Sequence, residues 1–89
     1  MSEVLNVKVE RLARLDNGSK IRAFCDLLFG GLFLIKGFRV VEGENGAFIG
    51  MPQHQSKHGK WFDVFVPGTP EIREYITEVI MQAYKGEEQ

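Results

Sequence analysis

The 89-residue sequence contains a single cysteine and no long hydrophobic run. One cysteine, Cys25, excludes an internal disulfide, which is typical of proteins in the reducing cytoplasm. The longest apolar stretch, Leu32–Ile35, is far shorter than the roughly 20 residues that a membrane-spanning helix needs. The first residues show no basic segment followed by an apolar core, so no secretion signal is expected. We therefore predict a cytoplasmic protein with no membrane association.

A strong excess of positive charge is also missing, because the net charge is −1. This balance argues mildly against nucleic-acid binding, which depends on neutralising phosphates. The charges are unevenly distributed, however. Residues 1–70 carry nine basic and seven acidic groups, whereas residues 71–89 carry two basic and five acidic groups. Any phosphate-binding surface is therefore expected in the first 70 residues.

The chain is also short of core-forming length. A domain of this size buries only about 60–65% of the surface that its unfolded chain exposes. We predict one domain over residues 1–89, stabilised further by pairing with a second copy in a homodimer.

Residues 6–28 alternate apolar and charged positions, which predicts a β-hairpin with one buried face. The turn contains Asn17-Gly18, a strong hairpin signal. A three-residue loop, Asp16-Asn17-Gly18, with Gly18 in a left-handed bulge position, places both apolar rows on one face. That register pairs Leu15 with Ser19, Ala13 with Ile21 and Val9 with Cys25. Arg11 is the one charged residue in the apolar row.

Three further strands and one helix are expected. The strands are predicted at Leu32–Val41, Ala47–Met51 and Lys60–Val66, with a polar loop over Gln53–Gly59. Thr69 suits the N-cap of a helix and Pro70 its first position, and Gly86 can end it. The fold class is therefore α+β: an antiparallel sheet of about five strands with one C-terminal helix packed on one face. The helix stripe comprises Ile72, Tyr75, Ile76, Val79, Ile80 and Ala83.

Catalytic and metal-binding residues are not expected. Cys25 lies in the apolar row of a strand, where a cysteine acts as a small hydrophobe rather than a nucleophile. His54 and His58 have a helical metal-ligand spacing, but they lie in a glycine-bounded loop with no further plausible ligand nearby. We predict that the protein is no enzyme and takes no cofactor, metal or small-molecule substrate.

Three features favour nucleic-acid binding. The predicted register places Arg14 opposite Lys20 with Arg22 on the same solvated face, although a solubilising face explains this pattern equally well. The acid-free loop with Lys57 and Lys60 ends at Trp61, which would either stack on a base or cover a sheet edge or dimer contact. Arg39 lies in a central strand, with Lys36 on the opposite face, and is either functional or paired with an acid such as Asp63. The predicted nucleic-acid contacts are Arg14, Lys20, Arg22, Arg39, Lys57, Lys60 and Trp61.

The run Phe38–Pro52 ends in Gly50-Met51-Pro52 and resembles the signature of the stage V sporulation protein G (SpoVG) family. The sequence departs from the family pattern at Gln53, where relatives typically have serine, and at Val66, where histidine is common. Together with the N-terminal hairpin, the resemblance covers nearly the whole chain. The matching residues are Arg39, Val40, Gly43, Gly46, Phe48, Met51, Pro52, Phe62, Asp63, Pro67, Arg73 and Tyr84.

The resemblance implies a bacterial, cytoplasmic regulator that binds DNA or RNA and influences septation, sporulation or gene expression. A rival interpretation is a protein-interaction module that acts on division proteins without contacting nucleic acid. The near-neutral charge of the chain favours this rival.

Overall fold

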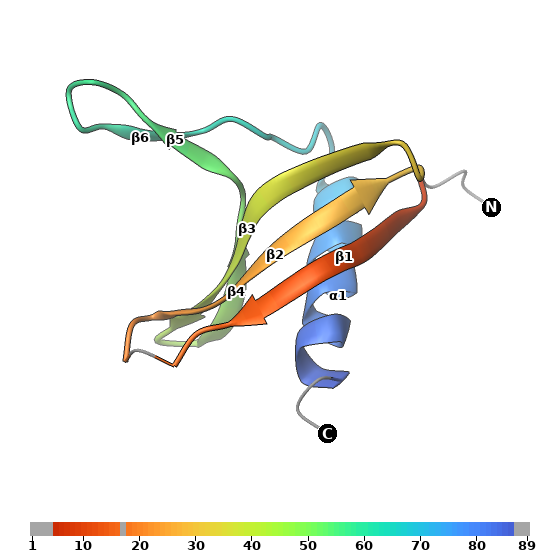
Figure 1. Ribbon diagram of the computed structural model, residues 1–89, viewed down its shortest axis with the longest axis horizontal. Helices are drawn as coiled ribbons and strands as arrows, with labels where there is room; N and C mark the ends of the chain where they lie inside the picture. Colours follow the sequence, from red (N-terminus) through yellow and green to blue (C-terminus); the bar gives the residue numbers. More distant parts are fainter. Residues whose placement is uncertain (1–4, 17, 87–89) are drawn as a thin grey trace.

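A computed structural model, which describes residues 5–16 and 18–86, confirms the α+β fold. Four antiparallel strands form the main sheet in the order β1-β2-β3-β4, and a two-stranded sheet projects beyond it (Figure 1). One helix crosses one face of the main sheet. The elements are β1 (Val7–Arg14), β2 (Ile21–Phe29), β3 (Phe33–Gly43), β4 (Gly46–Gly50), β5 (Gln53–Gln55), β6 (Trp61–Asp63) and α1 (Pro70–Gly86).

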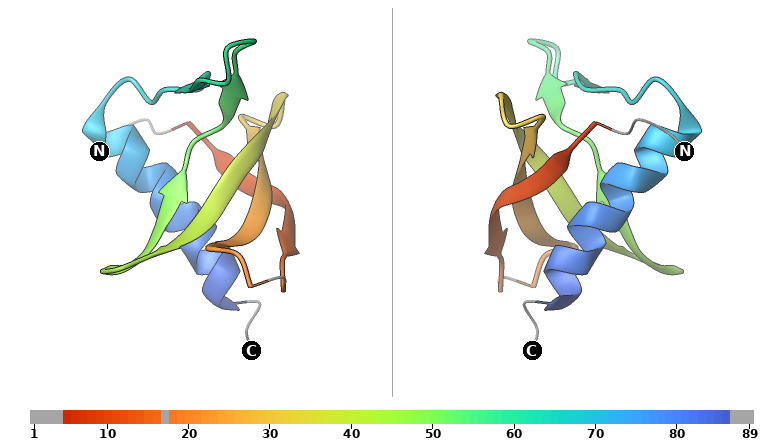
Figure 2. Two further views of the ribbon diagram at one scale, coloured as in Figure 1. Left: turned by 90° about the vertical axis from the view of Figure 1, so that its left-hand side faces the viewer. Right: turned by 90° about the vertical axis from the view of Figure 1, so that its right-hand side faces the viewer.

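The hydrophobic core lies between α1 and the sheet face beneath it, which we call the covered face (Figure 2). From Ala23 to Phe29, every second side chain of β2 enters this core, and Phe38 and Val40 enter it from β3. The segment after β6 also contributes, because the Phe65 ring packs edge-on against Phe38 with centroids 5.3 Å apart. The opposite side of the sheet, the open face, has no helix over it among the described residues (Figure 2). The fully buried side chains are Cys25, Leu27, Phe38, Val40, Ile76 and Ile80.

Helix α1 begins where the sequence predicts. The Thr69 hydroxyl accepts a hydrogen bond from the Ile72 amide at 3.2 Å, and Pro70 is the first helical residue. This cap satisfies one of the amide groups that every helix leaves unpaired at its start. Ile76 and Ile80 are fully buried at the centre of the predicted apolar stripe. Among the described residues, no helix is long and apolar enough to cross a lipid bilayer.

The predicted register of the first hairpin is wrong. The structure pairs Ala13 with Phe24 and Val9 with Leu27, and the Leu15 amide donates to the Arg22 carbonyl at 2.8 Å. The connection is therefore longer than three residues. Gly18 does adopt a left-handed conformation, with φ of 77°. Asn17 lies outside the described residues.

A β-bulge between Val9 and Arg11 explains the error. The bulge inverts the alternation of β1. Val7 and Val9 face the core before the bulge, and Leu12 faces it after the bulge. Arg11, the exception in the predicted apolar row, is thereby turned to the open face opposite Asp26. Strict period-two reasoning could not place this extra residue.

The structure also corrects the end of the sheet. Gln53–Gln55, predicted as loop, is strand β5, and the predicted strand Lys60–Val66 shortens to β6. These two strands pair with each other instead of adding a fifth strand to the main sheet. Pro52 has no amide hydrogen for the main ladder, and its carbonyl accepts from the Val64 amide at 2.9 Å. The chain therefore leaves the main sheet at Pro52.

A second bulge, in β3, reverses the predicted placement of Lys36 and Arg39 on opposite faces of the sheet. Cys25 pairs with Phe38 but Leu27 pairs with Ile35, so β3 has one residue more than β2 over this interval. Gly37 lies in the bulge with φ of 103°, a value that side chains rarely allow. The inversion brings Lys36 onto the open face with Arg39, whereas strict alternation placed them on opposite faces.

Candidate functional site

A groove of about 610 Å³ lies on the open face, between the sheet and the β5–β6 hairpin. It combines two cations with apolar and aromatic walls, and none of the described side chains that line it is acidic. Residues far apart in the sequence meet here because Pro52 turns the chain from β4 into the small hairpin. The groove is lined by Ile21, Phe24, Lys36, Gly37, Arg39, Pro52, Gln53, Trp61 and Val64.

Arg39 is held in the groove by its backbone surroundings. Its Nη2 donates a hydrogen bond of 2.9 Å to the Met51 carbonyl. The guanidinium also crosses the strand position of Gly50, where an added Cβ would lie 2.4 Å from Nη2. Only glycine at position 50 leaves room for the Arg39 guanidinium in this position. The alternative considered for Arg39, a pairing with Asp63, is not seen among the described residues, where the Asp63 carboxylate accepts a hydrogen bond from the Gln53 amide at 2.8 Å.

The group that accepts the hydrogen bond from Arg39 decides whether the positive charge of Arg39 is neutralised. A carbonyl oxygen fixes the guanidinium without neutralising it, and a guanidinium carries five N–H donors. Arg39 therefore keeps both its positive charge and most of its hydrogen-bonding capacity for a ligand.

Trp61 forms the outer wall of the groove, and its side chain is 59% exposed. Phe24, from the neighbouring strand to Arg39, is 41% exposed and contributes to the floor. Large exposed apolar side chains that surround cations are uncommon on a solvated surface and often mark a binding site. The structure thus joins two predicted residues, Arg39 and Trp61, in one site.

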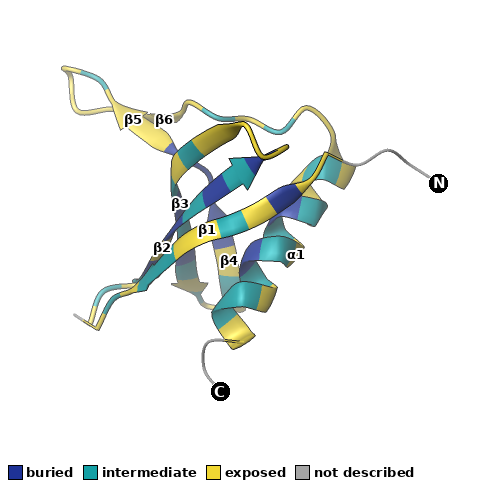
Figure 3. Ribbon diagram, turned by 45° about the vertical axis from the view of Figure 1, so that its right-hand side comes forward, coloured by how far each residue is buried: buried dark blue, intermediate teal, exposed yellow. Residues whose placement is uncertain are grey.

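The β5–β6 hairpin continues the positive surface away from the groove. Its turn is ordered by Ser56, whose hydroxyl accepts from the amides of His58 and Lys60 at 3.3 and 3.2 Å. Lys57 and Lys60 are exposed on this turn, and the hairpin is exposed along most of its length (Figure 3). Both lysines are therefore accessible to a ligand from solvent.

Arg14 lies elsewhere. The bulge in β1 turns its side chain toward the covered face, where it donates to the Tyr84 carbonyl and lies 4.3 Å from the Tyr84 ring centroid. A cation at the C-terminal end of a helix satisfies an unpaired carbonyl and opposes the negative end of the helix dipole. These contacts give Arg14 a role in stabilising the fold.

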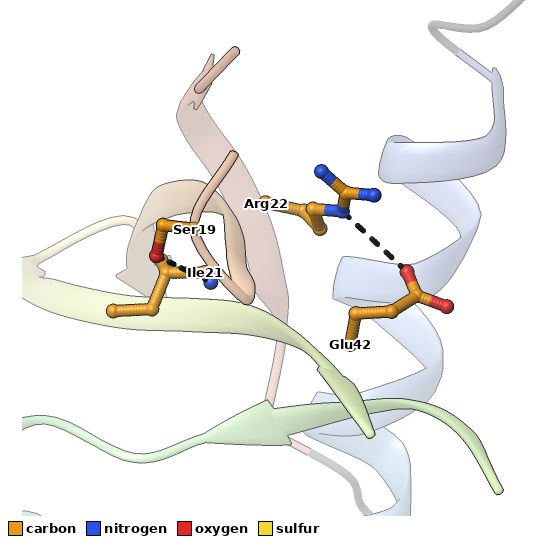
Figure 4. Close-up of polar contacts among 4 residues, drawn as sticks. All are labelled: Ser19, Ile21, Arg22 and Glu42. Carbon is orange, nitrogen blue, oxygen red and sulfur yellow. Dashed lines mark hydrogen bonds and ion pairs between the residues drawn. The ribbon is translucent and has the colours of Figure 1, made fainter. Parts of the chain in front are cut away.

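Lys20 and Arg22 are near each other but share their surroundings with acids. The Arg22 Nε lies 3.7 Å from a Glu42 carboxylate oxygen (Figure 4). Lys20 and Arg22 line a shallow hollow that also contains Glu44. An exposed ion pair of this kind adds little stability, but the acids offset the charge that a phosphate would meet. The expected trio of Arg14, Lys20 and Arg22 is thus not assembled on one face.

A hollow beside α1 provides a contrast. It is lined by Glu71, Glu74 and Glu78 against the single cation Arg73. Such a surface repels phosphates. The structure therefore places the acidic side of the molecule on the helix, as the charge distribution along the sequence predicts.

Cys25 and the two histidines, considered above as reactive side chains, lie apart from the groove lining. Cys25 is buried in the core, and this burial, together with the Asp26 carboxylate, raises the pKa of its thiol to about 12. Within the same residues, no three histidine, cysteine or acidic side chains are grouped to hold a metal ion. The His54 ring packs beside the Phe62 ring, with the ring centroids 6.5 Å apart.

Comparison with known proteins supports the sequence signature. The SpoVG family model matches residues 2–86. The chain belongs to the SpoVG family. A SpoVG relative from Archaeoglobus fulgidus is 35% identical over 88 residues, covering 99% of this chain and all of the relative. A relative from Treponema denticola is 30% identical, covering 93% of this chain and 86% of the relative. Both carry the name "Putative septation protein SpoVG".

In this SpoVG chain, the sequence interpretation missed Lys36 and Phe24 as parts of the groove. A signal for Lys36 was present, because a glycine inside a strand pattern, here Gly37, often marks a bulge. Phe24 carried no comparable signal. Its exposure depends on the open face having no helix over it.

Proposed function

We propose that the chain is a cytoplasmic nucleic-acid-binding regulator, acting on DNA or RNA as a homodimer, with a role in septation, sporulation or gene expression. The observation that carries this proposal is the groove that joins Lys36, Arg39 and Trp61 without an acidic lining residue. The family membership and the printed names of the relatives support the link to septation.

The proposed mechanism depends first on electrostatic attraction between the cations of this surface and phosphates. Arg39 would bind phosphate with donors that the Met51 carbonyl leaves unused, and Lys36 would contact the same strand. Lys57 and Lys60 on the hairpin would contact adjoining phosphates. Phosphate contacts hold a protein on the nucleic acid but do not read its sequence, so this surface predicts broad binding.

A homodimer would double this modest positive surface. Two linked sites raise the apparent affinity through effective concentration without any new contact. Exposed apolar side chains are available for self-association near the β2–β3 turn, where Leu32 is 80% and Phe33 68% exposed. A chain of this length also gains from the additional buried surface.

The rival is a protein-interaction module that does not contact nucleic acid. The apolar open face, with Phe24 and Phe48 exposed, favours it. The two functions differ in their response to salt, because phosphate binding weakens steeply as ionic strength rises, whereas apolar docking does not.

The test is fluorescence anisotropy of a labelled oligonucleotide at low and moderate salt. We expect wild-type binding to fall with salt, and a Lys36→Gln, Lys57→Gln, Lys60→Gln triple variant to bind at least about 10-fold more weakly. Lys85→Gln, which removes one cation from the helix, is the matched control and should bind nearly as wild type. Absence of binding at every salt concentration would favour the rival.

A further inference from the structure

We propose that the groove is a subsite for one unpaired nucleobase, which stacks on Trp61 while Lys36 and Arg39 hold the adjoining phosphate. This inference rests on the proposed nucleic-acid function and names the form of the ligand. It predicts that the protein distinguishes bases in single strands from a bare phosphate backbone and from duplex.

The walls of the groove suit a flat aromatic ligand. Trp61 presents its ring from β6, and Phe24 and Ile21 provide an apolar floor from β2. Pro52 lies close to Gly37, with its Cβ 3.5 Å from the position of an added Cβ there, at the point where the hairpin leaves the sheet. The volume of about 610 Å³ lies within the range of pockets that hold small ligands, about 300–1,000 Å³.

The charges identify a nucleotide rather than a purely apolar ligand. Two cations flank the apolar walls, and no acid lines the groove. The Arg39 guanidinium lies over Gly50 and donates a hydrogen bond to the Met51 carbonyl, which orients it in the groove. A ligand with one aromatic and one anionic part, as a nucleotide has, complements this combination of side chains.

Selectivity for unpaired bases follows from the geometry. A base within a duplex has both faces stacked and cannot lie against Trp61 unless it is flipped out, which costs free energy. An unpaired base pays no such cost, and every base has a π-face, so the subsite should tolerate all four bases.

The experiment compares three ligands of equal length: oligothymidylate, a strand of abasic residues with the same phosphates, and a duplex. Affinities are measured by anisotropy. Trp61, the only tryptophan in the sequence, reports its own environment by fluorescence. We expect the abasic strand to bind about 5- to 100-fold more weakly than oligothymidylate, and only base-bearing single strands to quench Trp61.

Variants sharpen the test. Trp61→Leu should abolish the difference between oligothymidylate and the abasic strand, and Trp61→Phe should restore part of it. Phe48→Leu alters a similarly exposed aromatic on the open face outside the groove and should preserve the difference.

The two proposals fail in different ways. Equal affinity for base-bearing and abasic strands, or an unchanged Trp61 emission on binding, would overturn the base subsite while the phosphate-binding function stands. No binding of any strand at low salt would overturn both.

Discussion

At the residue scale, Arg39 differs from the other predicted contacts in what holds it. Arg22 lies beside a carboxylate and Arg14 donates to a carbonyl at the end of the helix on the covered face, whereas Arg39 donates to the Met51 carbonyl inside the groove. Both Gly50 and Gly37 serve this arrangement. Gly50 leaves room for the guanidinium, and Gly37 forms the bulge that brings Lys36 to the same face.

Gly50→Ala should therefore impair binding with little effect on stability. The new Cβ would displace the Arg39 guanidinium, which is the movable end of a flexible side chain. We expect oligonucleotide affinity to fall several-fold and the free energy of unfolding to change by about 1 kcal/mol or less. Urea unfolding and anisotropy on the same sample would check this. A large loss of stability, or unchanged affinity, would contradict the account of Gly50.

Cys25 gives a pH prediction. Its thiol pKa is about 12 in the folded protein and 9.0 ordinarily, so the folded state holds the proton more tightly. The stabilisation is complete below pH 9.0 and is lost as the pH rises toward 12. In Cys25→Ala, the alkaline decline in unfolding free energy should be shallower than in wild type. Equally steep declines in unfolding free energy in the two proteins would show that the Cys25 thiol does not contribute to the pH dependence of stability.

The sequence was informative about which residue types lie in the site and less so about their arrangement. Arg39 and Trp61 were recognisable because a cation in a central strand and an aromatic beside lysines are unusual. Their meeting with Lys36 was not predictable from alternation, since one glycine bulge reverses the face of every residue beyond it.

At the element scale, bulges decide where the cations point. The helix was predictable in full because Thr69, Pro70 and the apolar stripe agree with each other. The first hairpin was not, because the bulge at the centre of β1 leaves no clear mark in the sequence beyond the misplaced Arg11. Strand β5 escaped prediction for another reason: Gln53–Gln55 is exposed throughout and has no apolar alternation.

Arg14→Gln tests the assignment of Arg14 to the fold. Loss of the contacts with the Tyr84 carbonyl and ring should lower the unfolding free energy by about 1 kcal/mol. Arg14→Lys, which keeps the charge, should restore part of it. Thermal unfolding measures the stability, and anisotropy measures binding. If Arg14→Gln weakens oligonucleotide binding as much as Arg39→Gln, Arg14 belongs to the interface instead.

At the scale of the whole molecule, the two sides of the sheet have different roles. The covered face and α1 provide the core, and the acidic surface of α1 faces away from the groove. The open face combines exposed apolar side chains with the cations of the groove. A net charge of −1 is therefore compatible with phosphate binding, because the opposing charges lie on different surfaces.

Self-association can be tested at the β2–β3 turn, where Leu32 and Phe33 are exposed. If this apolar turn contributes to the proposed homodimer, Phe33→Glu should shift the molar mass in light scattering toward the monomer. The fold should survive, because Phe33 is 68% exposed in the single chain. Val66→Glu, at a similarly exposed position in another segment, is the control. A dimer unchanged by Phe33→Glu would place the contact elsewhere.

The central claim is that Arg39 and its groove bind phosphate. The most direct measurement is the slope of log affinity against log salt concentration for a single-stranded oligonucleotide, with wild type and Arg39→Gln. We predict a clearly negative slope for wild type that becomes shallower by about 0.7 in the variant, the value for one lost phosphate contact on a single strand. An affinity independent of salt, or an identical slope in both proteins, would contradict the claim.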